Sequence, residues 1–400
     1  MPNQGPWSEC VHRNNKMLAV HKHNASALFG YTQRYHGPRA AIKTSGARDM
    51  ICSVRSCWKG FVTCFPLFSF SPLAIVSKII MKRPFNCEGM TMSETLTQDQ
   101  ISFYQENGYL VLENQIPDSW MHRIRREISR FEDEAALLSE SNERLDLEDT
   151  HTRNAPRLRR IKLPHTISTD LKELMLSDYI LGPARDLAGP NLRLHTSKPN
   201  MKSAGYGAAV EWHQDYAFYP HTNDDILAIG VIIDDMASEN GPLMVYPGSH
   251  KGPVYDHHVD GVFAGAMLPS DNGLDAKDAV SLMGPAGSIL IHHGRIVHGS
   301  SLNTSDRARR ILFYEMMAAD AFPLMGSMTR WEGIKDYDDR MLCARPTLNP
   351  RLKDIPVRIP QPQPDVPISI YEIQKGMKKR AFDVIDGPSG QGIKRSLPLS

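Results

Sequence analysis

From about residue 95 the chain shows a regular pattern of apolar residues. They recur first at helical spacing and, further along, at strand spacing. The segment 95–108 joins a threonine that can cap a helix to spaced apolar residues and a final glycine, which predicts a helix. Tyr109–Leu112 then predicts a strand. From Asp118 an amphipathic helix is predicted, and its apolar face comprises Met121, Ile124, Ile128, Phe131, Leu137 and Leu138.

Short apolar runs separated by Gly/Pro turn signals dominate the chain beyond residue 190. They predict strands, because each run has strand length and is bounded by residues that favour turns. Many short strands preceded by packing helices are typical of a mainly β fold with flanking helices, here a double-stranded β-helix, the jelly-roll form of the cupins. The predicted strands are the one entered through 208–210 and running to residue 215, then 226–233, 243–246, a buried strand that follows a turn at 286–287 and ends at His292, and 311–314; residues 192–196 lead toward the first of them.

Two segments have little periodicity and are predicted to be loops. Residues 142–156 are polar and charged, which favours a loop or lid. Residues 251–280 are rich in Gly, Asp and His, and so long a segment between strands favours a functional loop.

The sequence Trp212-His213-Gln214-Asp215 places an imidazole and a carboxylate two residues apart. On a strand, such residues project from the same face of the sheet. The spacing arises often by chance, so the pair gains meaning only if a second histidine joins it. Two histidines and one carboxylate on one face of a metal are the ligands of non-haem Fe(II) oxygenases.

The best candidate for the second histidine is His298, in the run His298-Gly-Ser that follows a predicted buried strand. His292 is a rival because it has the same strand parity as His298, and His293 lies beside it. Arg309 follows His298 by eleven residues, with Arg307 and Arg310 as alternatives.

These motifs occur in a particular order: H-x-D, then Asn240-Gly-Pro-Leu through Pro247-Gly-Ser-His250, then a strand ending in His298-Gly-Ser, then Arg309. In this order the chain resembles the phytanoyl-CoA dioxygenase family over roughly residues 95–317. The family consists of Fe(II)- and 2-oxoglutarate-dependent oxygenases, and its members begin with a similar helix–strand–helix support. His250 fits a structural role in its turn.

The resemblance implies a role for each of these residues. His213, Asp215 and His298 would hold Fe(II), leaving two coordination positions for 2-oxoglutarate and one for O2. Arg309 would bind the far carboxylate of 2-oxoglutarate through its planar fork, and Ser300 would add a hydrogen bond. A family lysine that reaches 2-oxoglutarate matches Lys162 best, with Arg160 as a competitor. Ascorbate is a candidate reductant.

Two features bear on the reaction and the substrate. Related iron halogenases replace the aspartate of H-x-D, so Asp215 favours hydroxylation. The strand 226–233 lacks the tryptophan that family members often carry there, so the acyl-CoA substrate is not carried over. Trp212 and Tyr216 flank the ligand pair and are predicted to be substrate-pocket walls or packing residues.

Charge and cysteine content divide the chain into parts. The net charge of +1 favours neither nucleic acid nor an anionic membrane surface as a partner. Residues 1–91 hold 12 Lys and Arg against 3 acidic residues, and five of the six cysteines. We interpret 1–91 as a gene-model extension or a targeting segment, 92–345 as the oxygenase domain, and 346–400 as a Pro-rich, extended and partly disordered tail.

The single cysteine beyond residue 91 indicates a reducing compartment. The protein is therefore expected inside the cell, in the cytoplasm, or in mitochondria if residues 1–91 target it there. No stable membrane insertion is expected, and the sequence does not indicate an oligomeric state.

The leading hypothesis is a dioxygenase that hydroxylates a small organic molecule and releases succinate and CO2. A catalytically silent jelly-roll protein that binds a ligand or metal is the alternative. A zinc hydrolase on the same three residues is a third hypothesis, but it gives Arg309 no role.

Overall fold

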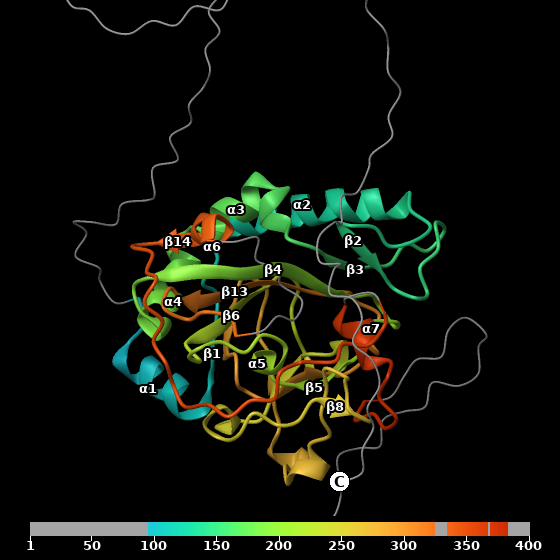
Figure 1. The fold of residues 1–400 in the computed structure, drawn as a ribbon. Helices are drawn as coiled ribbons and strands as arrows, with labels where there is room; N and C mark the ends of the chain where they lie inside the picture. Colours follow the sequence, from blue (N-terminus) through green and yellow to red (C-terminus); the bar gives the residue numbers. More distant parts are fainter. Residues whose placement is uncertain (1–94, 325–333, 367–368, 383–400) are drawn as a thin grey trace, which may run out of the picture. The chain divides into compact units, whose positions relative to one another are not determined.

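The structure, a computed structural model, describes residues 95–324, 334–366 and 369–382 (Figure 1). The segment interpreted as an extension, residues 1–91, lies outside the described residues, as does the end of the tail from residue 383. Within the described ranges, no helix has both the length and the apolar character needed to cross a membrane.

A large antiparallel sheet forms the wall behind the site. Its central strand β13 is ten residues long and pairs with β4 on one side and with β6 on the other. The order across the eight-stranded sheet is β1-β11-β6-β13-β4-β3-β2, and β14 also pairs with β4. The strands span Tyr109–Leu112 (β1), Leu145–Leu147 (β2), Leu158–Ile161 (β3), Leu192–Lys202 (β4), Ile226–Ile232 (β6), Ile289–His293 (β11), Arg309–Ala318 (β13) and Met341–Cys343 (β14).

A smaller antiparallel sheet faces the large one, in the order β10-β7-β12-β5. A cluster of buried apolar side chains joins the two sheets, with Phe313 and Leu290 from the large sheet and Val245 and Leu243 from the small one. Two opposed antiparallel sheets around one core confirm the predicted jelly-roll fold. The smaller sheet comprises Val210–His213 (β5), Leu243–Val245 (β7), Val280–Leu282 (β10) and His298–Ser300 (β12), and a separate pair is formed by His258–Val259 (β8) and Val262–Phe263 (β9).

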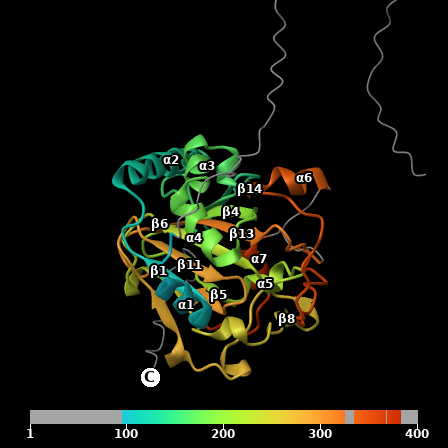
Figure 2. The same cartoon turned by 90° about the vertical axis from the view of Figure 1, so that its left-hand side faces the viewer.

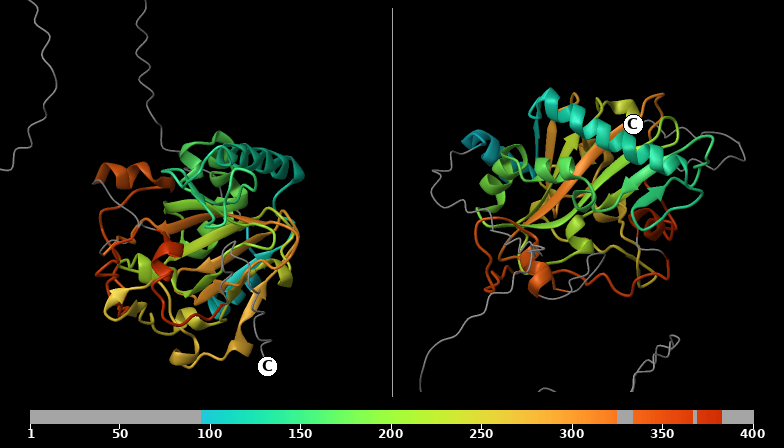
Figure 3. Two further views of the ribbon diagram at one scale, coloured as in Figure 1. Left: turned by 90° about the vertical axis from the view of Figure 1, so that its right-hand side faces the viewer. Right: turned by 90° about the horizontal axis from the view of Figure 1, so that it is seen from above.

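Helices cover the outer face of the large sheet, where α2 crosses its strands (Figure 3, right). Ile124, Ile128 and Phe131 of α2 are fully buried, and each contributes about 1.5–3 kcal/mol to stability. Figure 2 shows α1 beside β1, which follows it in the chain. The bounds are Gln98–Asn107 (α1), Asp118–Ala136 (α2), Thr169–Met175 (α3), Asp178–Ala188 (α4), Asp215–Phe218 (α5), Ile334–Asp339 (α6) and Ile370–Gln374 (α7), with short 3-10 turns at Pro164–Thr166, Ser238–Asn240, Ser249–Lys251, Ser270–Asn272 and Ala276–Asp278.

Three predictions differ from the structure in detail. The predicted loop 142–156 contains β2, whose three residues are all buried. Its middle residue, Asp146, is charged, and its ion pair with Arg160 allows this otherwise polar stretch to enter the sheet. Leu137, predicted on the buried face of α2, is 75% exposed because the helix ends at Ala136. The predicted loop 251–280 contains β8, β9 and 3-10 turns.

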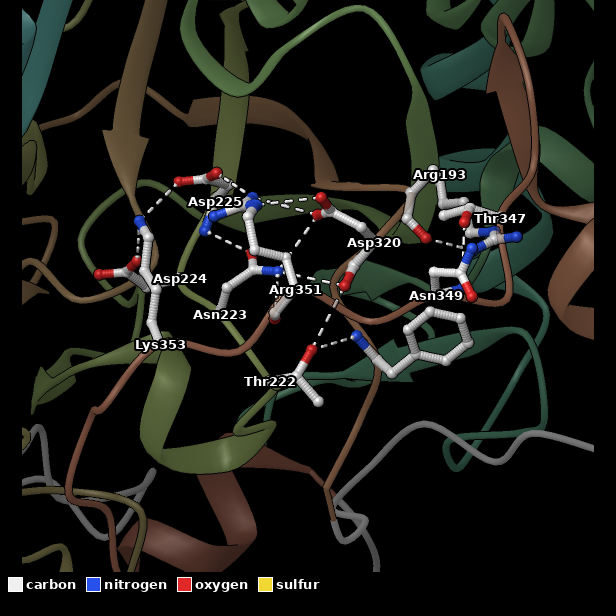
Figure 4. A network of polar contacts seen from close by, with 12 residues as sticks. Arg193, Thr222, Asn223, Asp224, Asp225, Asp320, Thr347, Asn349, Arg351 and Lys353 are labelled. Atoms are coloured by element: carbon white, nitrogen blue, oxygen red, sulfur yellow. Dashed lines mark hydrogen bonds and ion pairs between the residues drawn. The ribbon is translucent and has the colours of Figure 1, made fainter.

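The segment after residue 345 packs on the domain through an ionic network (Figure 4). Arg351 lies between Asp225 and Asp320 and forms ion pairs with both carboxylates. Lys353 pairs with Asp224 at 2.6 Å, and Asp224 also accepts from Arg295 at 2.8 Å. The extended tail is therefore fixed to the loop that leads into β6.

Gly108 ends α1 in the left-handed conformation, with φ +78°, and its Cα faces the His250 ring. A Cβ added at Gly108 would lie 2.8 Å from the ring carbon Cγ of His250. Gly273 has a similar backbone, with φ +75°, but nothing lies within 4 Å of the added Cβ.

We expect Gly108→Ala to lower the free energy of unfolding by about 2–4 kcal/mol, because backbone strain and a steric clash add. Gly273→Ala carries only the backbone strain and should cost about 1 kcal/mol. Urea unfolding of both variants measures the difference. Equal losses would show that the His250 contact contributes nothing.

Candidate metal and co-substrate site

His213 and Asp215 are positioned by the junction between β5 and α5. Strand β5 ends at His213, and Asp215 is the first residue of α5. The prediction that both residues belong to one strand is therefore wrong by two residues. Gln214 between them keeps an extended backbone, with φ −118° and ψ 127°, so the two side chains still project to the same side.

His298 reaches the same place because β12 pairs with β5. The register sets His298 opposite His213, and the two imidazole ring centroids are 4.1 Å apart. Each ring contacts a backbone carbonyl two residues earlier through Nδ1: His213 with Glu211 at 2.7 Å, and His298 with Ile296 at 3.0 Å. When Nδ1 carries the proton and donates to that carbonyl, Nε2 keeps its lone pair and can bind a metal.

The two Nε2 atoms face the Asp215 carboxylate. His213 Nε2 lies 3.8 Å and His298 Nε2 lies 3.9 Å from Asp215 Oδ1. One ligand atom from each of the three residues lies within 4.8 Å of the other two, and all three residues are buried. Two nitrogen donors and one oxygen donor at this spacing fit a non-haem iron.

The protonation states of the three residues also fit a metal site. Burial lowers the pKa of His213 to about 4 and holds the pKa of His298 well below its usual value, so both imidazoles are neutral at pH 7. Burial alone raises the pKa of Asp215, but the neighbouring His298, His292 and Lys198 outweigh it, so the pKa is low and the carboxyl is ionised. Neutral imidazoles and a carboxylate are the forms that bind a metal.

The rival histidines have different surroundings. His292 Nε2 lies 3.3 Å from Asp215 Oδ2, on the opposite oxygen from the one that faces His213 and His298. His292 therefore contacts the Asp215 carboxylate from the side away from His213 and His298. His293 points elsewhere, because its Nδ1 accepts from the backbone N–H of Arg295.

A cavity extends from the three residues along the inner face of the large sheet to Arg309. The Arg309 guanidinium is buried and donates to the Gly241 carbonyl through Nε at 3.1 Å and Nη2 at 2.8 Å. Among the described residues no carboxylate forms an ion pair with it, and burial lowers its pKa to about 10. A buried cation without a carboxylate fits a dicarboxylate ligand that supplies one.

The other arginines near Arg309 are already paired. Arg310 lies on the opposite face of β13 and pairs with Asp234 at 2.8 Å. Arg307 is exposed and pairs with Glu239. Ser300 lines the cavity with Arg309, as the predicted hydrogen-bond role requires.

Lys162 is not among the residues that line the cavity. Its ammonium pairs with Asp146 at 2.7 Å and a third of its side chain is exposed. Arg160, the competitor, does line the cavity and pairs with Asp146 at 2.6 Å. The difference follows from β3, because residues 160 and 162 lie on either side of the strand's end at Ile161. The structure thus favours Arg160 over Lys162.

Trp212 and Tyr216 also lie outside the cavity lining. Trp212 packs between Tyr246 and Phe382, with ring centroids 4.7 and 5.5 Å away. Tyr216 is buried, and its hydroxyl donates to the His221 carbonyl. Of the two readings offered for this pair, the structure gives packing rather than substrate contact.

Several lining residues were not predicted from the sequence. On β4 and β13 they alternate, so that every second residue faces the cavity: Lys198, Asn200 and Lys202 on β4, and Ile311, Phe313 and Glu315 beyond Arg309 on β13. The pattern Lys-x-Asn-x-Lys is visible in the sequence, but no strand was predicted over residues 198–202, so its alternation was not recognised.

The C-terminal segment also contributes to the site. Tyr371 of α7 lines the cavity, and Arg159 stacks over its ring at 4.3 Å. Gln374 accepts from the Glu211 backbone N–H at 3.0 Å and donates to the Gly265 carbonyl at 2.9 Å. Glu211 supplies the carbonyl that orients His213, so α7 holds the peptide behind a candidate ligand.

Comparison with known proteins gives consistent matches. The family model described as phytanoyl-CoA dioxygenase (PhyH) matches residues 104–311. A probable alpha-ketoglutarate-dependent hypophosphite dioxygenase from Stutzerimonas stutzeri is 36% identical over 283 residues, covering 70% of this chain and 97% of the relative. The L-proline trans-4-hydroxylase of Streptomyces griseoviridis is 30% identical over 56% of this chain and 87% of its own length.

Solved structures were also matched. The crystal structure of EctD from S. alaskensis with bound Fe has a TM-score of 0.49 and 21% identity, covering 61% of this chain and 85% of that one. The crystal structure of EctD from S. alaskensis with 2-oxoglutarate and 5-hydroxyectoine has the same TM-score at 20% identity, covering 70% of this chain and 93% of that one.

Gln374→Ala removes three hydrogen bonds of the side chain, those with the Glu211 N–H, the Glu211 carbonyl and the Gly265 carbonyl, and so frees the backbone behind His213. We expect the affinity for Fe(II) to fall roughly tenfold, as when other groups that orient a metal ligand are removed. Anaerobic Fe(II) titration measures it. Gln363→Ala, in the same segment but bonded only within the tail, is the matched control. An unchanged Fe(II) affinity in Gln374→Ala would contradict the role of α7.

Proposed function

Because this chain belongs to the phytanoyl-CoA dioxygenase family, we propose that it uses Fe(II) held by His213, Asp215 and His298 to oxygenate a small molecule at the expense of 2-oxoglutarate. The chain is a non-haem, 2-oxoglutarate-dependent dioxygenase, with Fe(II) as cofactor and 2-oxoglutarate and O2 as co-substrates. The observation that carries the residue assignment is the meeting of three buried ligand groups from distant segments.

The proposed reaction is hydroxylation: R–H, 2-oxoglutarate and O2 give R–OH, succinate and CO2. One oxygen atom enters the substrate and the other enters succinate. When bound, the iron supplies the oxidative decarboxylation and the activation of O2. The chain's own residues bind the reactants, set their orientation and keep water away.

Each part of the site has a task in this proposal. The two imidazoles and the Asp215 carboxylate leave half of an octahedral coordination shell open for the co-substrates. Arg309 fixes the far carboxylate of 2-oxoglutarate with the donors that Gly241 does not use, and Ser300 lies beside it. The Lys202 side chain donates to the backbone carbonyls of Ala208, Ser300 and Ser301 and so joins the segments at this end of the cavity. Burial and the neighbouring Arg309 hold the pKa of Lys202 well below its usual value.

The relatives indicate how wide the range of substrates is. Their names specify hypophosphite and L-proline, both small molecules. We therefore propose a small-molecule substrate. The silent jelly-roll alternative gains no support, since all three ligand residues are present and lie together.

Asp215→Ala removes the one anionic ligand, so we expect turnover of 2-oxoglutarate to fall by about a thousandfold or more, the scale on which an essential group of this kind acts. Succinate formed by the Fe(II)-loaded protein measures it. Asp271→Ala, an exposed aspartate, should leave it unchanged. Succinate formation that persists in Asp215→Ala, or that does not need iron, would refute the proposal.

Arg309→Ala should raise the KM for 2-oxoglutarate about tenfold or more, because a buried charge-assisted hydrogen bond is lost. Arg309→Lys keeps the charge without the planar fork and should recover only part of the loss. Arg307→Ala is the control, since Arg307 is exposed and pairs with Glu239. An Arg309→Ala enzyme with an unchanged KM would exclude this residue from the co-substrate site.

A further inference from the structure

The cavity has a second charged end, which lies beside the metal ligands and away from Arg309. Arg309 pairs with Lys202 in the register of β13 and β4, whereas Lys198 pairs with Phe313. Lys198 is thus four residues from Lys202 along β4, which separates their Cα atoms by about 13 Å. Glu315 lies a further two residues along β13, opposite Thr196.

This second end lies beside the metal ligands. In the register of the large sheet, Ala228 of β6 lies between His292 of β11 and Glu315 of β13. His292 Nε2 contacts Asp215 Oδ2 at 3.3 Å. Lys198, Glu315 and His292 all line the cavity. We define these three residues as the metal-end subsite.

Donors are in excess in the metal-end subsite. Both oxygens of Glu315 are occupied, because Oε1 pairs with Lys198 Nζ at 2.6 Å and Oε2 accepts from the Tyr219 hydroxyl at 3.1 Å. An ammonium has three N–H donors, and among the described residues Glu315 is the one acceptor within reach of Lys198. A quarter of the Lys198 side chain is open, with 26% exposure, so a ligand can reach the remaining donors.

The loaded iron adds little net charge to the site, because the two charges of Fe(II) and the two carboxylates of 2-oxoglutarate cancel. Arg309 would face 2-oxoglutarate at the far end of the cavity, and Lys198 would be the cation beside the metal ligands. The remaining N–H donors of this ammonium favour an anionic ligand.

An aromatic side chain bounds the metal-end subsite. Phe313 lies opposite Lys198 in the register of β13 and β4 and forms part of the cavity wall beside it. This wall limits the space next to the Lys198 ammonium and favours a ligand of few atoms.

We propose that the substrate of this dioxygenase is a small monoanionic oxyanion, a carboxylate or a phosphorus oxyanion, whose oxygen binds Lys198 in the metal-end subsite. The inference rests on the proposed function, because the subsite is defined by its position beside the metal ligands. In this arrangement Lys198 places the X–H bond of the anion toward the open coordination positions, while Arg309 holds 2-oxoglutarate at the far end.

The test measures binding of small probes to the anaerobic protein loaded with Fe(II) and saturating 2-oxoglutarate. The probes are hypophosphite and formate as monoanions, formamide as the neutral counterpart of formate, and L-proline as a zwitterion. The readouts are calorimetry and the shift of the visible charge-transfer band. We expect one or both monoanions to bind and formamide to bind at least about tenfold more weakly, because a charge-assisted hydrogen bond is lost.

Two variants with opposite expected effects identify the residue. Lys198→Met should weaken binding of the anion about tenfold or more, and Glu315→Gln should strengthen it, because the competing carboxylate is neutralised. Lys277→Met, an exposed lysine paired with Asp275, is the matched control and should change nothing. If Lys198→Met does not fold, the strengthening in Glu315→Gln decides.

The outcomes separate this inference from the function on which it rests. A loaded protein that shows no charge-transfer band overturns the proposed function and the inference together. If the band is normal, the proposed function stands and any of four results overturns the inference alone. These are that no anion binds, that formamide or L-proline binds as well or better, that Lys198→Met binds the anion normally, or that the anion displaces 2-oxoglutarate.

Discussion

The pairing of β12 with β5 is the constraint on which the site depends. It sets His298 opposite His213, although the two residues are 85 positions apart in the sequence. Backbone hydrogen bonds fix this register, and a shift by one residue would turn His298 to the other face of the sheet. Both imidazoles are then oriented by backbone carbonyls two residues earlier, that of Glu211 in β5 and that of Ile296 in the turn before β12, so the local backbone also sets the ligand geometry.

Burial of charge is the second constraint, and the fold meets it with local partners. Arg160 has Asp146, Lys198 has Glu315, and Lys202 has three backbone carbonyls. Arg309 has the least compensation, because a single neutral acceptor, the Gly241 carbonyl, receives its hydrogen bonds. An unpaired buried guanidinium is costly to the folded protein. That cost is offset when a carboxylate ligand binds, so the same feature that weakens the empty protein favours occupation by the co-substrate.

The sequence was sufficient where function depends on local spacing. The H-x-D pair, His298 and Arg309 could be located because each stands in a short motif, and the helices α1 and α2 because their periodicity is strong. Lys162 was favoured over Arg160 because a motif cannot show which side of a strand's end a residue occupies. Lys198 and Glu315 were missed because their meeting depends on the register of β4 and β13, which no local pattern encodes. Residues 370–374 were missed because a short helix in a Pro-rich tail has no periodicity to detect.

The bond between Gln374 and Glu211 has a consequence for the order in which the protein is made. It joins residues 163 positions apart, so β5 leaves the ribosome long before its support does. Synthesis runs from the N-terminus at several residues per second, and contacts of such sequence separation form late. The ligand strand therefore reaches its final support only after α7 has been synthesised, and metal loading in the final geometry follows the synthesis of α7 rather than that of β5.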